Sequence, residues 1–119
     1  MRVLIVEDDM TIALMIEDML IDCGHEVVGI AMRLADALEH AGALDFDLAI
    51  LDVNLDGSMS FPVAEKLRER GVPFFFATGY GAAGIPGDYA EWRALKKPFT
   101  QEELQSTMIA TITAKSGPA

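Results

Sequence analysis

Short runs of apolar residues without polar alternation constrain the fold of this chain more than any other feature of its sequence. Four runs are clear and a fifth is weaker, at residues 3–6, 27–30, 48–51, 74–76 and 93–95. A strand with one exposed face alternates between apolar and polar residues, whereas a parallel strand covered on both faces is apolar throughout. The runs therefore predict a parallel sheet between two layers of helices.

Helical patterns separate these runs. Apolar residues at three- and four-residue spacing predict helices over residues 10–23 and 33–41, and Gly24 and Gly42 stand where these helices should end. Parallel strands need crossover connections, and these connections are right-handed. The alternation therefore indicates an α/β fold with a doubly wound sheet.

Two more helices begin at recognisable caps. Ser60 can cap a helix that ends at Gly71. Thr100 and Glu103 have the spacing of a capping box before the last helix. Between these two helices, residues 79–91 contain four glycines and one proline, a composition that favours a loop or at most a short, frayed helix.

Length, charge and cysteine use limit the class of protein. The 119 residues suit one domain, predicted over residues 1–114, with a disordered tail at 115–119. A formal net charge of -10 disfavours direct nucleic-acid binding, which needs clustered Lys and Arg. No apolar run approaches the roughly 20 residues of a membrane-spanning helix. The single cysteine, Cys23, suits a reducing compartment, so we expect a cytoplasmic protein without membrane insertion.

Polar residues follow four of the predicted strands. Because the carboxyl ends of parallel strands meet at one edge of a sheet, where ligands bind, we expect their side chains to face one another. These residues are Glu7 and Asp8 after the first strand, Asp52 at the third, Thr78 at the fourth and Lys97 after the fifth.

The carboxylates predict a metal site. If the first and third strands are neighbours, Glu7, Asp8 and Asp52 repel one another unless a cation lies between them. Oxygen ligands suit Mg2+, with Mn2+ or Ca2+ as alternatives, and the backbone carbonyl of Asn54 is placed to be a further ligand. Helix capping is the other role open to Glu7 and Asp8, and we assign that role to Asp9.

A carboxylate beside magnesium can attack a phosphoryl group, which makes Asp52 the candidate nucleophile. The hydroxyl of Thr78 and the ammonium of Lys97 can stabilise the remaining phosphoryl oxygens. The residues thus indicate a phosphoryl-accepting site.

Together these motifs resemble those of bacterial response-regulator receiver domains of the CheY-like superfamily. The resemblance covers nearly the whole chain, and its motifs are Leu4-Ile5-Val6-Glu7-Asp8-Asp9, Leu51-Asp52-Val53-Asn54, Ala77-Thr78-Gly79 and Lys97-Pro98-Phe99. The run Phe76-Ala77-Thr78-Gly79-Tyr80 also resembles a subgroup of receivers that are often single-domain proteins served by HWE-type histidine kinases.

The resemblance implies a flavodoxin-like sheet of five strands in the order 2-1-3-4-5. The composition of residues 79–91 departs from the family pattern and predicts a short or disordered fourth helix. It implies that a histidine kinase or a phosphotransfer protein phosphorylates Asp52, and that a conformational change then signals to a downstream protein in a two-component phosphorelay. Such a domain is not an enzyme in the ordinary sense, because it catalyses only its own phosphorylation and dephosphorylation.

The resemblance also assigns individual roles. Asp8 matches the direct metal ligand, and Glu7 matches the acidic partner that acts through water. Thr78 matches the switch hydroxyl, and Lys97 matches the lysine whose bond to Pro98 is expected to be cis.

One departure and two alternatives remain. Ala94 stands where most receivers have Tyr or Phe, so an aromatic partner for the switch must come from elsewhere, with Tyr80 or Trp92 as candidates. A haloacid-dehalogenase-type phosphatase would need a second aspartate where Asn54 stands. A degenerate receiver that only binds proteins would not need the full set of site residues.

Overall fold

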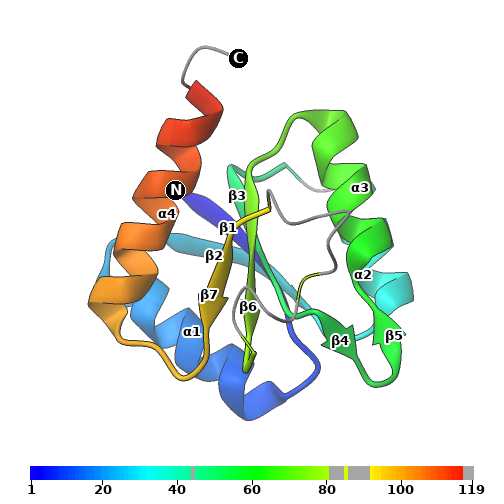
Figure 1. Cartoon of the computed structure of the whole chain (residues 1–119), viewed down its shortest axis with the longest axis horizontal. Coiled ribbons are helices and arrows are strands. Elements are labelled where there is room, and N and C mark those ends of the chain that lie inside the picture. Colours follow the sequence, from blue (N-terminus) through cyan, green and yellow to red (C-terminus); the bar gives the residue numbers. More distant parts are fainter. Residues whose placement is uncertain (44, 81–84, 86–91, 117–119) are drawn as a thin grey trace.

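The computed structural model describes residues 1–43, 45–80, 85 and 92–116. Five strands form one parallel sheet in the order β2-β1-β3-β6-β7 (Figure 1). Their bounds are Arg2–Val6 (β1), Glu26–Ala31 (β2), Leu48–Leu51 (β3), Phe74–Thr78 (β6) and Ala94–Lys96 (β7). Each predicted apolar run coincides with or overlaps one of these strands, and the predicted strand order is confirmed.

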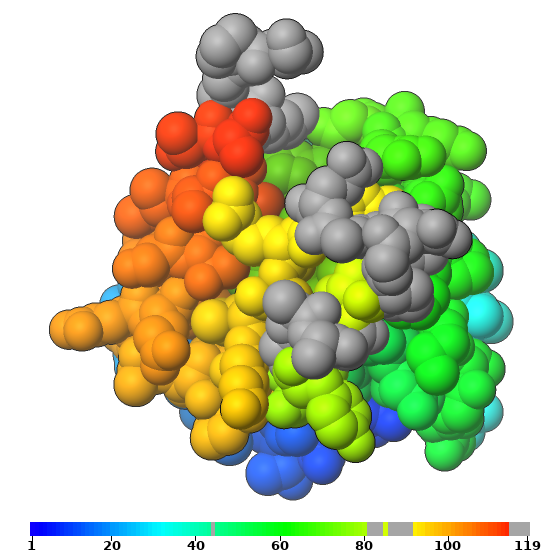
Figure 2. Space-filling view, in the orientation of Figure 1, coloured from blue at the N-terminus to red at the C-terminus, as the bar shows by residue number. Residues whose placement is uncertain are grey.

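Helices cover both faces of the sheet. Those within the described residues are α1 (Met10–Asp22), α2 (Leu34–Ala43), α3 (Phe61–Arg70) and α4 (Gln101–Ser116). Helices α1 and α4 pack on one face, and α2 and α3 pack on the other. Figure 2 shows α4, in orange and red, on the opposite side of the molecule from α3, in green, with β7 in yellow between them. Of these helices, none combines the length and apolarity needed to cross a bilayer.

Alternate residues of the central strands enter two separate cores. Val3 and Ile5 of β1 pack with α1 and α4, whereas Leu4 and Val6 pack with α2 and α3. These four side chains are at most 1% exposed. Burial of each such side chain contributes roughly 1.5–3 kcal/mol to stability. Because successive side chains point to opposite faces, strand β1 is packed on both sides. The residues that directly follow it are therefore placed by a rigid support.

Gly42 does not end α2, which corrects the predicted helix boundary. The helix continues to Ala43. A Cβ atom at position 42 would lie 2.7 Å from Cε of Lys66 on α3. The end of the Lys66 side chain therefore packs against Gly42 inside the helix, which places the glycine at a contact between α2 and α3.

The other predicted helix ends have mixed outcomes. Oδ1 of Asp9 caps α1 by accepting a hydrogen bond from the N–H of Thr11 at 2.9 Å. Gly71 ends α3 in a left-handed conformation, with φ of 71°. Ser60 occupies the N-cap position of α3, but its buried hydroxyl makes no capping hydrogen bond.

Two predictions concern segments at the limits of the described residues. The sequence predicts a short or disordered fourth helix in 79–91, and most of that segment lies outside the described residues. Helix α4 continues to Ser116, past the predicted domain boundary at residue 114 and into the segment predicted as a tail. Residues 117–119 lie outside the described residues.

A two-stranded antiparallel sheet follows β3, and no element was predicted there. Strand β4 (Asn54–Leu55) pairs with β5 (Ser58–Met59). Figure 1 shows this hairpin between the carboxyl end of β3 and the start of α3. The β4–β5 hairpin therefore lies at the edge of the sheet where the predicted site residues are placed.

The predicted capping box of α4 is confirmed. Oγ1 of Thr100 accepts a hydrogen bond from the N–H of Glu103 at 3.1 Å, and Oε1 of Glu103 accepts one from the N–H of Thr100 at 3.0 Å. The two residues thus satisfy two backbone donors at the start of the helix.

Replacing Thr100 with Ala should lower the free energy of unfolding by about 1 kcal/mol, because the N–H of Glu103 loses its acceptor. Urea denaturation measures this change. Ser106→Ala, at an exposed position within α4, is the control and should change stability by less than about 0.5 kcal/mol. Equal losses in the two variants would contradict the capping role.

Candidate functional site

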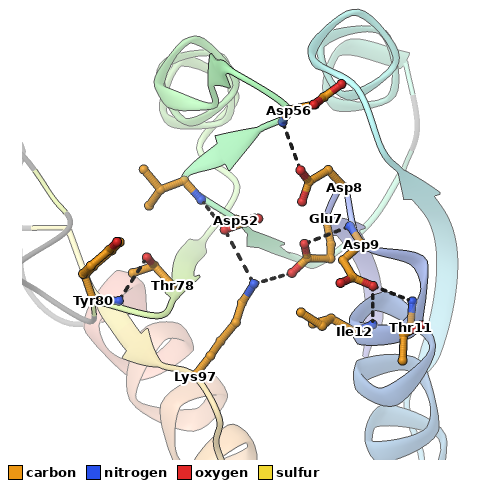
Figure 3. A network of polar contacts seen from close by, with 11 residues as sticks. Glu7, Asp8, Asp9, Thr11, Ile12, Asp52, Asp56, Thr78, Tyr80 and Lys97 are labelled. Carbon is orange, nitrogen blue, oxygen red and sulfur yellow. Dashed lines mark hydrogen bonds and ion pairs between the residues drawn. The ribbon is translucent and has the colours of Figure 1, made fainter.

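The residues predicted to form a site gather at the carboxyl edge of the sheet (Figure 3). Glu7 and Asp8 directly follow β1, and Asp52 directly follows β3, which is a neighbour of β1 in the sheet. Thr78 ends β6, and Lys97 directly follows β7. The parallel register therefore brings together side chains that are far apart in the sequence.

The three carboxylates form a cluster that fits a divalent cation. Glu7, Asp8 and Asp52 each offer one oxygen atom, and these atoms lie within 4.8 Å of one another. Glu7 is buried, and the other two are partly buried. Oxygen is the donor that Mg2+ prefers in proteins, so the donor set suits this ion. The role predicted for the backbone carbonyl of Asn54 stays a prediction.

Lys97 lies directly against the carboxylate cluster. Its Nζ atom pairs with Oε1 of Glu7 and lies 3.6 Å from Oδ1 of Asp52. The bond between Lys97 and Pro98 is cis, as predicted. An ammonium at this place offsets the repulsion among the carboxylates. The same ammonium is within reach of a group attached to Asp52.

The crowding changes the acidity of the carboxyl groups. Burial raises the pKa of Glu7 to about 7, although its hydrogen bond with Lys97 opposes this rise. Burial also raises the pKa of Asp52, and the charge of Lys97 opposes the change. For Asp8, burial works in the same direction, but hydrogen bonds from Glu7 and from the N–H of Asp56 prevail and lower the pKa. The cluster therefore retains a proton at a pH where isolated carboxyl groups are ionised.

Asp9 stays outside the carboxylate cluster, as predicted. Its side chain caps α1, while its backbone N–H donates a hydrogen bond to Oε2 of Glu7 at 3.2 Å. The cap thus helps to hold Glu7 in place.

A cavity of about 530 Å3 opens beside Asp52. Thr78 lines it and is only 5% exposed, and its Oγ1 accepts a hydrogen bond from the N–H of Tyr80 at 3.4 Å. The other lining residues are Val53, Asn54, Met59, Phe61, Gly79 and Tyr80. The cavity therefore leaves open space next to both Asp52 and Thr78.

One contact of the site was not predicted from the sequence. The backbone N–H of Asp56, in the turn of the β4–β5 hairpin, donates a hydrogen bond to Oδ2 of Asp8 at 3.0 Å. The available signal was the dipeptide Asp56-Gly57, which is typical of two-residue hairpin turns.

Position 94 is an alanine, and Tyr80 and Trp92 are the predicted sources of the aromatic side chain that it lacks. The ring of Trp92 packs against Phe74 and Phe76 of β6, with centroid distances of 5.3 and 5.7 Å. Trp92 therefore contacts the strand that ends in Thr78. The side chain of Tyr80 is 78% exposed.

The chain matches a known family over most of its length. Residues 3–109 match the family model described as response regulator receiver domain. Transcriptional regulatory protein TcrA of Mycobacterium tuberculosis is 34% identical over an alignment covering 98% of this chain and 47% of that protein. Transcriptional regulatory protein TctD of Salmonella typhimurium is 32% identical, with coverage of 98% and 54%. The chain thus spans about half the length of these curated relatives.

Solved structures give the same picture. The solution structure of SdrG from Sphingomonas melonis Fr1 is 39% identical, covers 93% of this chain and 95% of that chain, and has a TM-score of 0.84. The response regulator REC domain of PhyR from Erythrobacter litoralis is 28% identical, with coverage of 99% and 94% and a TM-score of 0.85. The BeF3-activated conformation of SdrG from Pseudomonas melonis Fr1 is 38% identical, with coverage of 93% and 95% and a TM-score of 0.80.

The buried carboxyl of Glu7 should make the metal-free protein less stable as the pH rises. Its pKa is about 7 in the folded protein against an ordinary value of 4.5, so its stabilising effect is full below pH 4.5 and is lost through pH 7. Between about pH 5.5 and pH 8.5, with a chelator present, we expect a loss on the order of 2 kcal/mol in the free energy of unfolding.

Denaturation at several pH values measures this loss, and Glu7→Gln should remove it. Asp18→Asn, at an exposed position of α1, is the matched control and should keep the wild-type dependence. If the Glu7→Gln variant kept the full dependence, Glu7 would not be its source.

Proposed function

Since the chain belongs to the response regulator receiver domain family, we propose that Asp52 accepts a phosphoryl group from a histidine kinase or a phosphotransfer protein in a magnesium-dependent reaction. One observation carries this proposal, namely the convergence of Asp52 with Glu7, Asp8 and Lys97 at one edge of the sheet. A structural role alone would not require three carboxylates and an ammonium at the same place.

The transfer needs little besides a nucleophile and positive charge around it. A carboxylate oxygen of Asp52 attacks the phosphorus atom, and the bond from phosphorus to the donor histidine breaks. The electron pair of that bond stays with the histidine nitrogen, which then takes up a proton. The N–H of Val53 holds Oδ1 of Asp52 at 2.9 Å and so fixes the orientation of the nucleophile.

Lys97 and Thr78 stabilise the phosphoryl oxygens. Nζ of Lys97 lies 3.6 Å from Oδ1 of Asp52, close enough to donate a hydrogen bond to an oxygen of a group attached there. The hydroxyl of Thr78 shares the cavity with Asp52 and is the second donor. Lys97 lies beside Asp52 before the reaction, and Thr78 is the switch hydroxyl that would move toward the phosphoryl group.

The carboxylates of Glu7, Asp8 and Asp52 and the backbone carbonyl of Asn54 would hold Mg2+, with Mn2+ or Ca2+ as alternatives. When bound, the ion supplies positive charge that offsets the negative charge of the carboxylates and of the transferring phosphoryl oxygens. By the resemblance, Asp8 and Asp52 would bind the ion directly, and Glu7 would act through water.

Phosphorylation signals by a conformational change to a downstream protein in a cytoplasmic two-component phosphorelay. A net charge of -10 argues against direct contact with nucleic acid by this domain. The similarity to SdrG and to the REC domain of PhyR supports a signalling role, and the subgroup motif ending in Tyr80 supports an HWE-type kinase as the phosphoryl donor. The domain is a phosphoacceptor that hydrolyses its own phosphoryl group, not an enzyme that turns over a free substrate.

Asn54 argues against a phosphatase with a second acidic residue. Its Oδ1 accepts a hydrogen bond from the N–H of Gly57 at 2.7 Å, so the amide stabilises the hairpin turn. An amide cannot act as the general acid that such a phosphatase needs.

With acetyl phosphate and Mg2+, the protein should gain one phosphoryl group, and Asp52→Asn should gain none because the nucleophile is absent. Intact mass measurement detects the label, and peptide mapping locates it. Asp9→Asn is the matched control, because Asp9 is acidic and lies next to the site but caps α1, so it should keep the label. A label on another residue, or labelling that persists with a chelator, would refute the proposal.

Tyr80 should slow the loss of the phosphoryl group. Tyr80 is one of the residues that line the cavity beside Asp52, so its bulk would narrow the route by which water reaches the phosphorus atom. We expect Tyr80→Ala to shorten the lifetime of the aspartyl phosphate a few-fold, while Tyr80→Phe keeps it near the wild-type value. The decay of labelled protein after donor removal measures the lifetime, and equal lifetimes in all three proteins would contradict this role.

A further inference from the structure

The β4–β5 hairpin has a tightly defined turn. Leu55 pairs with Ser58, which leaves Asp56 and Gly57 as a two-residue loop. Both loop residues have positive φ, 52° for Asp56 and 91° for Gly57. Positive φ at both positions defines the turn that matches the twist of a hairpin, and glycine adopts it without strain.

The hairpin is anchored on the protein from several directions. The side chain of Leu55 is 2% exposed and packs in the core shared with α2 and α3. Across the turn, Oδ1 of Asn54 accepts a hydrogen bond from the N–H of Gly57 at 2.7 Å. At the base, the N–H of Ser60 donates a hydrogen bond to the carbonyl of Val53 at 2.8 Å. The backbone of the turn is therefore held in one place.

The anchored turn reaches across to the first strand. The N–H of Asp56 donates a 3.0 Å hydrogen bond to Oδ2 of Asp8, which is 48 residues away in the sequence (Figure 3). Asp8 lies with Glu7 and Asp52 in the carboxylate cluster, so once these neighbours are ionised, repulsion favours rotation of its side chain away toward solvent. The hydrogen bond opposes that rotation.

We propose that the Asp56-Gly57 turn is a positioning element of the metal site, which holds the carboxylate of Asp8 toward Glu7 and Asp52 before the cation binds. The inference rests on the proposed function, because it assumes that the carboxylate cluster binds Mg2+. The contact uses the backbone of Asp56, so the conformation of the turn matters more than the side chain at position 56. Asn54, whose carbonyl is a candidate ligand, belongs to the same hairpin.

Gly57→Val tests the proposal, because a β-branched residue disfavours the positive φ of 91° and should displace the N–H of Asp56. Gly24→Val is the matched control. Gly24 has φ of 85°, and a Cβ there, as at Gly57, would meet no atom within 4 Å. Gly24 follows α1 and makes no hydrogen bond to the carboxylate cluster among the contacts of the described residues. The two substitutions thus impose similar backbone strain at different places.

Titration calorimetry with Mg2+ is the first measurement. We expect Gly57→Val to weaken Mg2+ binding about fivefold, which corresponds to about 1 kcal/mol, and Gly24→Val to bind like the wild type. Thermal unfolding of the metal-free proteins should show similar losses of stability in the two variants. Unchanged binding in Gly57→Val, or equal weakening in both variants, would overturn the proposal.

The second measurement needs no metal. In the metal-free wild type, the amide hydrogen of Asp56 should exchange with solvent several-fold more slowly than in Asp8→Ala, because only the wild type retains the acceptor. Equal exchange rates would overturn the proposal even if Mg2+ binds. If the wild type did not bind Mg2+, the proposed function would lose its metal site, whereas the exchange rate would still show whether the turn holds Asp8.

Discussion

Mutual repulsion among the carboxylates of Glu7, Asp8 and Asp52 is the constraint around which this edge of the protein is built. Their oxygen atoms lie within 4.8 Å of one another, and the ammonium of Lys97 pairs with Glu7 and lies 3.6 Å from Asp52. Burial raises the pKa of Glu7 and of Asp52, so charge in the cluster is unfavourable until positive charge offsets it. A cation would relieve this repulsion, and the proposed phosphoryl transfer to Asp52 depends on such positive charge.

The sheet supplies the stability that such crowding requires. Strands β1 and β3 are neighbours, and both are buried on the two faces by alternate side chains that enter separate cores. The carboxylate residues follow these strands directly, so the buried strands fix the position of their backbone. Lys97 approaches from β7, at the other end of the site, and Thr78 approaches from β6. The parallel arrangement makes this convergence possible because every strand ends at the same edge.

The short segments that follow the strands orient the carboxylate side chains. Asp9 caps α1 and donates its N–H to Glu7, and the β4–β5 hairpin brings the N–H of Asp56 to Asp8. With the N–H of Val53 bonded to Asp52, all three carboxylates accept a hydrogen bond from a backbone N–H group that follows a strand. The hairpin also contributes Met59 to the lining of the cavity beside Asp52. The same short hairpin thus contacts the carboxylate cluster and lines the cavity next to it.

The local pattern of the sequence determined the strands, most helix ends and the set of residues at the carboxyl edge. Apolar runs, the Thr100 capping box and the cap at Asp9 depend on neighbours within a few residues, so they can be recognised without the fold. Three features could not be predicted in this way. They are the place of Gly42 inside a helix, the buried hydroxyl of Ser60 that does not cap its helix, and the contact of Asp56 with Asp8. Each depends on groups brought together by packing, such as Lys66 against Gly42 across two helices. Sequence alone therefore indicated which side chains meet, whereas only the tertiary structure decided how they are oriented, because orientation is set by contacts between segments distant along the chain.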